Sequence, residues 1–222
     1  MALAKFIADA KRSLGPVLNR TGGILYSAAD TLSLGEIYIL GLNPGGDGGP
    51  TIAQDLDALL DRKDNSYLDE KWENRAGSYS SGQAPLQRRV NWLISALGYD
   101  LRRVCASNLI FMKSRSESGV NYPGDADLCW PVHERILGLV HPRLVLAFGN
   151  SSLSPYAYFR QRFSRGNNEE TVPSGHGSWK CRGFDASVAN YKLYVAGLPH
   201  LSRYSPIGKE EVVEWLKNRI RT

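Results

Sequence analysis

Two short segments carry the side chains with the most distinctive chemistry. Gly41-Leu42-Asn43-Pro44-Gly45 places an amide in a glycine-rich turn, and Pro199-His200-Leu201-Ser202-Arg203 places an imidazole beside a hydroxyl. An amide can orient a water molecule but cannot act as a strong base. A neutral imidazole can donate a hydrogen bond to an oxygen on which negative charge develops. These residue types suit a reaction that depends on stabilising a leaving group.

The first segment lies in a loop of high glycine content. Residues 41–50 contain five glycines, so the backbone can approach a ligand closely and present its N–H groups. No Gly-Lys-Ser/Thr follows, which excludes a Walker loop, and the spacing does not match the dinucleotide-binding fingerprint. Taken alone, these glycines fit a structural turn equally well.

Short apolar runs followed by turn residues predict buried strands that alternate with helices. We expect strands at 36–42, 104–111, 144–148 and 193–197. Helical spacing, together with breakers such as Pro85 and Gly98, predicts helices at about 3–14, 85–97, 132–140, from 155 onward, and 209–220. This alternation predicts an α/β fold: a roughly four-stranded parallel sheet with helices on both faces, in a single domain spanning residues 1–222.

Each predicted strand ends at or just before a polar residue. These residues are Asn43, Asn108, Asn150 and His200. Ligands of parallel α/β sheets bind beyond the carboxyl ends of the strands, so we expect the four side chains to converge on one crevice. Asn108 could instead cap the next loop, and Asn150 could belong to a plain strand-to-helix turn.

The order and spacing of these segments resemble the uracil-DNA glycosylase superfamily. Residues 41–45 are similar to its first motif, in the Gly-x-Asn-Pro-Gly form of the mismatch-specific and single-strand-selective branches. Residues 199–203 are similar to its second motif, and Asn108 stands where the family carries a base-reading asparagine. The similarity covers about residues 36–206. Leu201 departs from the usual proline, which bears on the rigidity of that loop.

The resemblance implies a monofunctional DNA glycosylase that hydrolyses the N-glycosidic bond of uracil, and of related deaminated bases, in base excision repair. Asn43 would position the attacking water, and His200 would donate a hydrogen bond to uracil O2. Asn108 would read the O4 and N3–H edge of the base. The rest of the first motif would surround the base: Gly41, Leu42, Pro44 and Gly45. Neither motif contains a lysine, which argues against Schiff-base lyase chemistry.

A base in duplex DNA must be flipped out before it can be excised. The candidate DNA-binding residues are Asn150, Ser202, Arg203 and Tyr204. Ser202 would bind a flanking phosphate, while Arg203 or Tyr204 would fill the vacated stack. A solvated loop explains Arg203 and Tyr204 equally well.

The flipped base also needs an aromatic face. Tyr67, Trp72 and Tyr79 lie in the interval where the family supplies one, and Tyr79, in a Gly/Ser-rich loop, is favoured. Each of them also fits ordinary packing. Residues 175–179, with a histidine and a tryptophan, predict either a segment that faces DNA or covers the pocket, or a surface loop with a docked tryptophan.

Composition is compatible with DNA as the partner. The net charge of +5 favours binding to a polyanion, although many other proteins share such a charge. Cys105, Cys129 and Cys181 are too scattered for a metal site and too few for the family's iron–sulfur branches, so we expect buried thiols and neither a metal nor a cofactor. The sequence shows no membrane-spanning run and no secretory signal, which predicts an intracellular protein. We expect it to act as a monomer.

Two other functions remain open at this stage. The chain could bind nucleic acid through a glycosylase fold without cleaving it, and Leu201 slightly favours this alternative. It could also act on free nucleosides or nucleotides. Base release from a uracil-containing oligonucleotide supports the glycosylase, and tight binding to abasic or mismatched DNA without base release supports the second function. Turnover of small substrates but not of oligonucleotides supports the third.

Overall fold

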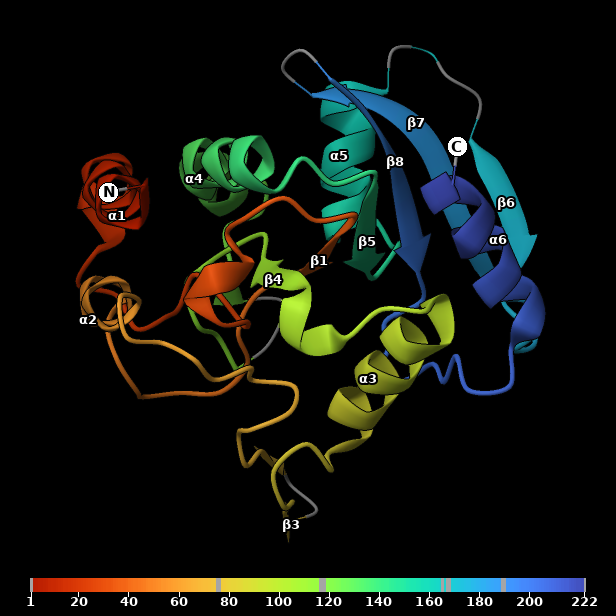
Figure 1. The fold of residues 1–222 in the computed structure, drawn as a ribbon, viewed down its shortest axis with the longest axis horizontal. Coiled ribbons are helices and arrows are strands. Elements are labelled where there is room, and N and C mark those ends of the chain that lie inside the picture. The colour runs from red at the N-terminus through yellow and green to blue at the C-terminus, as the bar shows by residue number, and fades with distance from the viewer. Residues whose placement is uncertain are drawn as a thin grey trace.

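A mixed sheet of six strands organises the structure. The structure is a computed structural model that describes residues 2–74, 77–115, 119–164, 166, 169–188 and 191–221. The strands of this sheet are β1 Ile37–Gly41, β4 Cys105–Asn108, β5 Leu144–Phe148, β6 Glu170–Pro173, β7 Lys180–Val188 and β8 Tyr191–Leu198. They lie in the order β4-β1-β5-β8-β7-β6. Figure 1 shows this sheet between layers of helices.

The four strands that the apolar runs predict are all present, and they are parallel to one another. β1 lies between β4 and β5, with Gly41 opposite Asn108 and Ile37 opposite Leu144. β8 pairs with the other side of β5. The carboxyl ends of these strands therefore meet along one edge of the sheet.

The sheet is nevertheless mixed, because β7 and β6 extend it as antiparallel strands beyond β8. No apolar run in the sequence predicts a strand in this region. Lys180 and Arg182 are exposed whereas Cys181 between them is buried, which is the period-two pattern of a strand with one solvated face. The prediction of a four-stranded, purely parallel sheet is therefore wrong, since the sheet has two further strands at its edge.

Helices cover both faces of the sheet, as predicted. The helices are α1 Ala2–Ser13, α2 Ile52–Ala58, α3 Pro85–Leu97, α4 Gly124–Val140, α5 Pro155–Phe163 and α6 Glu210–Arg221. In β1, Tyr38 and Leu40 pack into a core shared with α1, α4 and α5. Ile37 and Ile39 point the other way, into a core shared with α3 and α6. Burial from both sides explains why β1 and β5 are apolar throughout.

The helix ends follow local chemistry. α3 begins at Pro85 and ends before Gly98, whose φ of 94° is easily reached only without a side chain. α4 begins at Gly124, well before Val132, where apolar periodicity predicts it. Within the described part of the chain, no helix is both long and apolar enough to cross a membrane.

The connection between β1 and α3 contains structure that the sequence pattern does not predict. α2 begins at a reciprocal cap, in which the Thr51 hydroxyl accepts from the Gln54 backbone N–H and the Gln54 side chain accepts from the Thr51 N–H. A small antiparallel pair follows, with β2 at Glu73–Asn74 and β3 at Gly77–Ser78. This connection carries aromatic residues to the carboxyl edge of the sheet.

His133 is a fully buried histidine that ties α4 to the end of β4. Its Nε2 lies 2.9 Å from the Leu109 carbonyl oxygen, and its Nδ1 lies 2.9 Å from the Tyr38 hydroxyl oxygen. Because a carbonyl only accepts, Nε2 donates to Leu109 and Nδ1 accepts from Tyr38. Burial lowers the pKa of His133 to about 4, against the opposing effect of backbone hydrogen bonds. The neutral imidazole thus holds the residue next to Asn108.

The free energy of unfolding is expected to fall as the pH drops from about 6.5 to about 4. The pKa of His133 is lower in the folded chain than its ordinary value of 6.5, so the unfolded chain binds the proton first. Stabilisation that is present above pH 6.5 is therefore lost on acidification, by about 3 kcal/mol in total. Denaturant unfolding of the parent and of His133→Gln at several pH values measures this. The variant should be less stable at neutral pH but less sensitive to acid, and equal sensitivity would contradict the assignment.

Candidate active site

A cavity of about 680 Å³ opens at the carboxyl ends of the parallel strands. Asn43 follows β1, Asn108 ends β4 and His200 follows β8, and all three line this cavity. The remaining first-motif residues that line it are Gly41, Leu42 and Gly45. Pro44 is buried and is not one of the lining residues. Three of the four polar strand-end residues thus share one cavity.

Asn108 and Gly41 lie very close together in the cavity wall. The Asn108 side chain is 5% exposed, and its Oδ1 would lie only 2.1 Å from a Cβ added at Gly41. Asn108 Nδ2 is itself buried and makes no hydrogen bond of good geometry to a described residue, although the Tyr26 hydroxyl lies close enough for the Asn108 side chain to lower its pKa. Asn108 therefore presents an unsatisfied donor at the cavity, and such donors are rare in folded proteins.

Asn43 directs its amide hydrogens at protein oxygens. Its Nδ2 lies 2.9 Å from the Pro44 carbonyl oxygen and 3.3 Å from the Ser114 hydroxyl oxygen. These contacts fix the orientation of the amide. A water molecule would therefore meet the side-chain oxygen, which can only accept a hydrogen bond.

His200 has a defined tautomer when it is neutral. The Ser202 backbone N–H donates to His200 Nδ1 across 3.2 Å, and the Ser202 hydroxyl lies 2.7 Å from the same nitrogen. Because a backbone N–H can only donate, Nδ1 must accept, and the ring proton resides on Nε2. His200 can therefore offer an N–H donor to a ligand without being charged.

The loop that carries His200 is held from both sides. Arg89 on α3 donates to the carbonyl oxygens of Leu201 and Ser202 at 2.7 and 2.8 Å. Leu201 is fully buried in the core shared with α3 and α6. Apolar burial and the Arg89 contacts thus order this loop although it lacks the proline of the family motif.

Tyr204 is not available to DNA in this structure. Its side chain is 0% exposed, and its hydroxyl donates to the Ser174 carbonyl oxygen at 2.9 Å. The prediction that Tyr204 fills a vacated base stack is therefore wrong. Tyr204 instead packs in the same core as Leu201 of the loop that carries His200.

Tyr67 and Trp72 form an aromatic wall of the cavity, together with Tyr26. The ring centroids of Tyr67 and Trp72 are 5.7 Å apart, and those of Tyr26 and Tyr67 are 5.8 Å apart. The Glu70 carboxylate accepts from the Trp72 indole N–H at 3.1 Å, which orients that ring. The sequence pattern favours Tyr79 as the stacking residue, but Tyr79 is not among the lining residues. Tyr67 and Trp72, rather than Tyr79, are therefore the candidates for stacking on a ligand in this cavity.

Tyr26 is a cavity residue that the sequence motifs do not identify. Its backbone N–H donates to the Ala106 carbonyl oxygen on the outer edge of β4 at 2.8 Å. Burial and the Glu70 carboxylate raise the pKa of its hydroxyl, and the neighbouring Asn108 side chain opposes them. Tyr26 precedes β1 in the chain. It lies outside the interval between the first motif and α3, where the resemblance places the aromatic residue, so no local sequence pattern identifies it.

A buried ion pair fixes the segment that contains Tyr26. Asp55 on α2 is 4% exposed and accepts from the Ile24 backbone N–H at 2.8 Å. The Arg62 guanidinium binds this carboxylate and also donates to the Leu25 carbonyl oxygen at 2.7 Å. Asp55 and Arg62 thus hold the backbone immediately before Tyr26.

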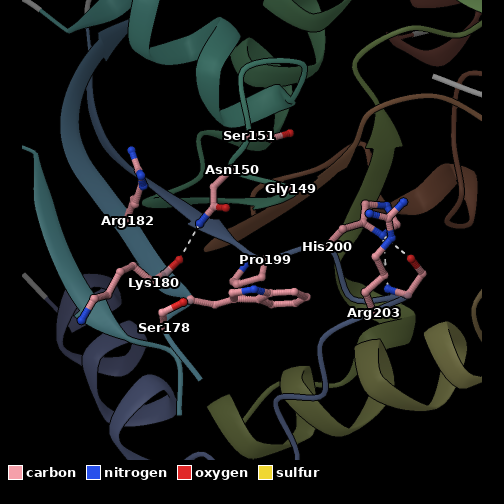
Figure 2. A pocket seen from close by; sticks show the side chains of 11 residues that line it. Gly149, Asn150, Ser151, Ser178, Lys180, Arg182, Pro199, His200 and Arg203 are labelled. Carbon is pink, nitrogen blue, oxygen red and sulfur yellow. Dashed lines mark hydrogen bonds between the residues drawn. The ribbon is translucent and has the colours of Figure 1, made fainter. Parts of the chain in front are cut away.

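A second cavity, of about 400 Å³, adjoins the first at His200, which lines both. The predicted DNA-binding residues Asn150, Ser202 and Arg203 line this second cavity (Figure 2). The Ser202 hydroxyl contacts His200 Nδ1, as described above. Arg203 is exposed.

Asn150 uses its amide donor within the protein. Its Nδ2 donates to the carbonyl oxygens of Lys180 at 2.7 Å and Gly197 at 3.1 Å. These acceptors belong to β7 and β8, so Asn150 ties the loop after β5 to both strands. Asn150 therefore lines the second cavity, but its amide nitrogen already donates to protein oxygens.

The three cysteines are buried, as expected. They are Cys105 on β4, Cys129 on α4 and Cys181 on β7. Burial raises the pKa of each thiol to about 12, which keeps the thiols uncharged at neutral pH. In the described residues, no three histidine, cysteine or carboxylate side chains gather so that they could hold a metal ion.

No protein-family model matches the chain, and no curated protein matches it. The function must therefore be inferred from the side chains that the cavity brings together and from the two motifs. Each of these local features can be tested by substitution.

Gly41→Ala is expected to displace Asn108, because the new Cβ would lie 2.1 Å from its side-chain oxygen. We expect a loss of roughly 100-fold in any activity that depends on Asn108, and destabilisation of about 1–3 kcal/mol. Release of uracil, the activity that the sequence resemblance implies, and thermal unfolding measure the two effects. Gly138→Ala is the matched control, since nothing lies within 4 Å of an added Cβ there. Similar activity losses in both variants would refute the steric argument.

Proposed function

We propose that this chain is a monofunctional DNA glycosylase with a uracil-DNA glycosylase-like fold, and that it hydrolyses the N-glycosidic bond of uracil. Related deaminated bases are its further candidate substrates, and base excision repair is the corresponding process. The observation that carries the proposal is the single cavity lined by Asn43, Asn108 and His200. Aromatic walls with a few convergent polar groups are the usual form of a site for a planar ligand.

Asn108 supports uracil as the base. Its buried Nδ2 needs an acceptor, and uracil presents the O4 carbonyl oxygen where cytosine presents an amino group. With cytosine, the amino group of the base would face the Asn108 amide nitrogen. Two donors would then meet without an acceptor, at a cost of about 1–3 kcal/mol for each buried group. The amide oxygen of Asn108 can accept from uracil N3–H.

His200 supports departure of the base as an anion. When the bond between C1′ and N1 breaks, both electrons remain on uracil and negative charge develops on O2. Because Nδ1 accepts from Ser202, the Nε2–H of neutral His200 is the donor that we assign to this oxygen. A donor held in place before the reaction stabilises the developing charge without reorganisation.

Asn43 supports the addition of water. Its amide oxygen can accept a hydrogen bond from a water molecule and so orient the lone pair of that water toward C1′. The water oxygen bonds to C1′ as the sugar acquires oxocarbenium character, and the released proton passes to solvent or to the uracil anion. Asn43 needs no change of charge in this role. Neither motif contains a lysine for a covalent intermediate, although Lys71 and Lys113 also line the cavity.

The central experiment measures base release from uracil-containing oligonucleotides, single- and double-stranded. His200→Ala should lower the rate about 10²- to 10³-fold, because one donor to a developing oxyanion is lost. Asn43→Ala should lower it roughly 100-fold, because the water is no longer oriented. Alkali-induced strand cleavage, read on a gel, reports the abasic product.

Matched controls remove the same residue types far from the cavity. The control variants are His141→Ala and Asn218→Ala. His141 lies before the amino end of β5, and Asn218 lies near the carboxyl end of α6. Both should retain parental rates. Intact strands with the folded parent protein would refute the enzymatic proposal, and tight binding to abasic DNA without base release would identify a non-cleaving DNA-binding protein instead.

Asn108→Asp tests base reading separately from catalysis. An ionised carboxylate replaces the amide donor with an acceptor, so it disfavours uracil O4 and suits the cytosine amino group. We expect uracil release to fall at least about 10-fold and the ratio of cytosine to uracil release to rise. Parallel single-turnover assays with the two bases in one sequence context measure this ratio, and an unchanged ratio would remove Asn108 from the reading role.

A further inference from the structure

The second cavity carries basic side chains from two separate elements. Lys180 and Arg182 reach it from β7, and Arg203 reaches it from the loop after β8. Among the described residues that line it, none carries a carboxylate. Figure 2 shows Lys180 and Arg182 on one side, His200 and Arg203 on the other, and Pro199 between them. Such an arrangement attracts an anion to the space next to His200.

The positions of Lys180 and Arg182 follow from strand geometry. Alternate residues of a strand share a face, and the intervening Cys181 is buried in the core. Arg182 pairs in register with Gly197 of β8, three positions before His200. The antiparallel pairing of β7 and β8 therefore fixes the basic face relative to the first cavity. Arg182 also makes a long contact, 3.5 Å, with Glu169.

Trp179 adds an aromatic surface to the same cavity. It lines the space and is 40% exposed, although large aromatic side chains are usually buried. Its ring packs on the His176 imidazole with centroids 4.7 Å apart. An exposed indole beside cationic groups matches the pattern by which proteins bind single-stranded nucleic acid, with stacking for the base and positive charge for the backbone.

The turn that carries Trp179 is held by backbone contacts. The Trp179 N–H donates to the His176 carbonyl oxygen, and the Ser174 N–H donates to the Trp179 carbonyl oxygen, each at 3.1 Å. Lys209 donates to the Gly175 carbonyl oxygen at 2.6 Å. An aromatic group held in this way loses little conformational entropy when a base stacks on it.

We propose that the second cavity binds the nucleotide adjacent to the one whose base is excised. The neighbouring base stacks on Trp179, and Lys180, Arg182 and Arg203 bind the phosphate that joins the two nucleotides. This assignment rests on the proposed glycosylase function, because it requires one DNA strand to occupy both cavities and to pass His200, which lines both. The subsite accepts any base, since every base has a face that stacks.

The test uses single-stranded oligonucleotides with a central tetrahydrofuran abasic site, which the enzyme cannot cleave. In one set, the nucleotide on the 5′ or the 3′ side is also replaced by tetrahydrofuran. Fluorescence anisotropy gives Kd for the parent, Trp179→Ala, Trp179→Phe and the control Leu34→Ala, which removes an exposed leucine that lies before β1. Loss of the neighbouring base should weaken binding to the parent about 10-fold on one side.

The proposal requires Trp179 and the neighbouring base to be coupled. Trp179→Ala should lower affinity for the complete oligonucleotide by a similar factor and should abolish the effect of removing that base. Trp179→Phe should retain most of the coupling, and Leu34→Ala should retain all of it. Additive losses, or no measurable binding by the parent protein, would overturn the subsite.

The basic residues are tested through salt dependence. Lys180→Gln with Arg182→Gln should reduce the slope of log affinity against log salt by about 0.7 for each phosphate that the protein no longer neutralises. The control pair, Lys5→Gln with Arg12→Gln on α1, should leave the slope unchanged. A parental slope in the first pair would overturn the assignment of these residues to the phosphate.

Base release from uracil oligonucleotides separates this proposal from the proposed function. Binding that depends on Trp179 without base release would refute glycosylase activity but support the subsite. Base release that depends on neither Trp179 nor the neighbouring base would support the activity but overturn the subsite.

Discussion

Gly41 and Asn108 meet where β1 and β4 end, and the form of the cavity depends on how closely they approach. The Asn108 oxygen occupies space that a side chain at position 41 would need. Beyond this contact the two chains stay paired, since Leu109 N–H donates to the Gly41 carbonyl oxygen and Ile110 N–H donates to that of Leu42, both at 2.8 Å. The buried and unsatisfied Asn108 Nδ2 costs about 1–3 kcal/mol, which the cores on the two faces of the sheet must offset. A ligand acceptor would relieve that cost, so the site favours a polar ligand.

The other walls of the cavity are held by polar groups that contact backbone rather than the cavity itself. Asp55 fixes the segment before Tyr26, Arg89 holds the carbonyl oxygens that follow His200, and His133 holds the carbonyl oxygen that follows Asn108. Each of these anchors comes from a helix, and each acts on a loop or strand end. A site assembled from distant parts of the chain is thereby kept in one arrangement before any ligand arrives, which is the condition for electrostatic stabilisation of a transition state.

Local sequence patterns predict the features of this protein that they encode directly. The parallel strands are buried on both faces, so their apolar runs identify them, and the residues that end β1 and β4 and follow β8 converge as the topology requires. The sequence pattern does not predict β7, because its exposed face carries Lys180 and Arg182, which interrupt any apolar run. Tyr26 reaches the cavity by pairing with the edge of β4, and Tyr204 is drawn into the core by tertiary packing. Such long-range contacts leave no periodic signal in the sequence.

The pairing of β7 with β8 also constrains how this chain can change in length. A single residue inserted in β7 before Arg182 would invert every side chain on one side of the insertion, and would exchange buried positions such as Cys181 with exposed ones. An insertion of two residues at the same place would preserve the faces while moving the turn at 174–179 by about 7 Å. Related chains that lengthen this strand are therefore expected to do so in even steps, whereas odd changes belong in the turn at 174–179, where no sheet register has to be kept.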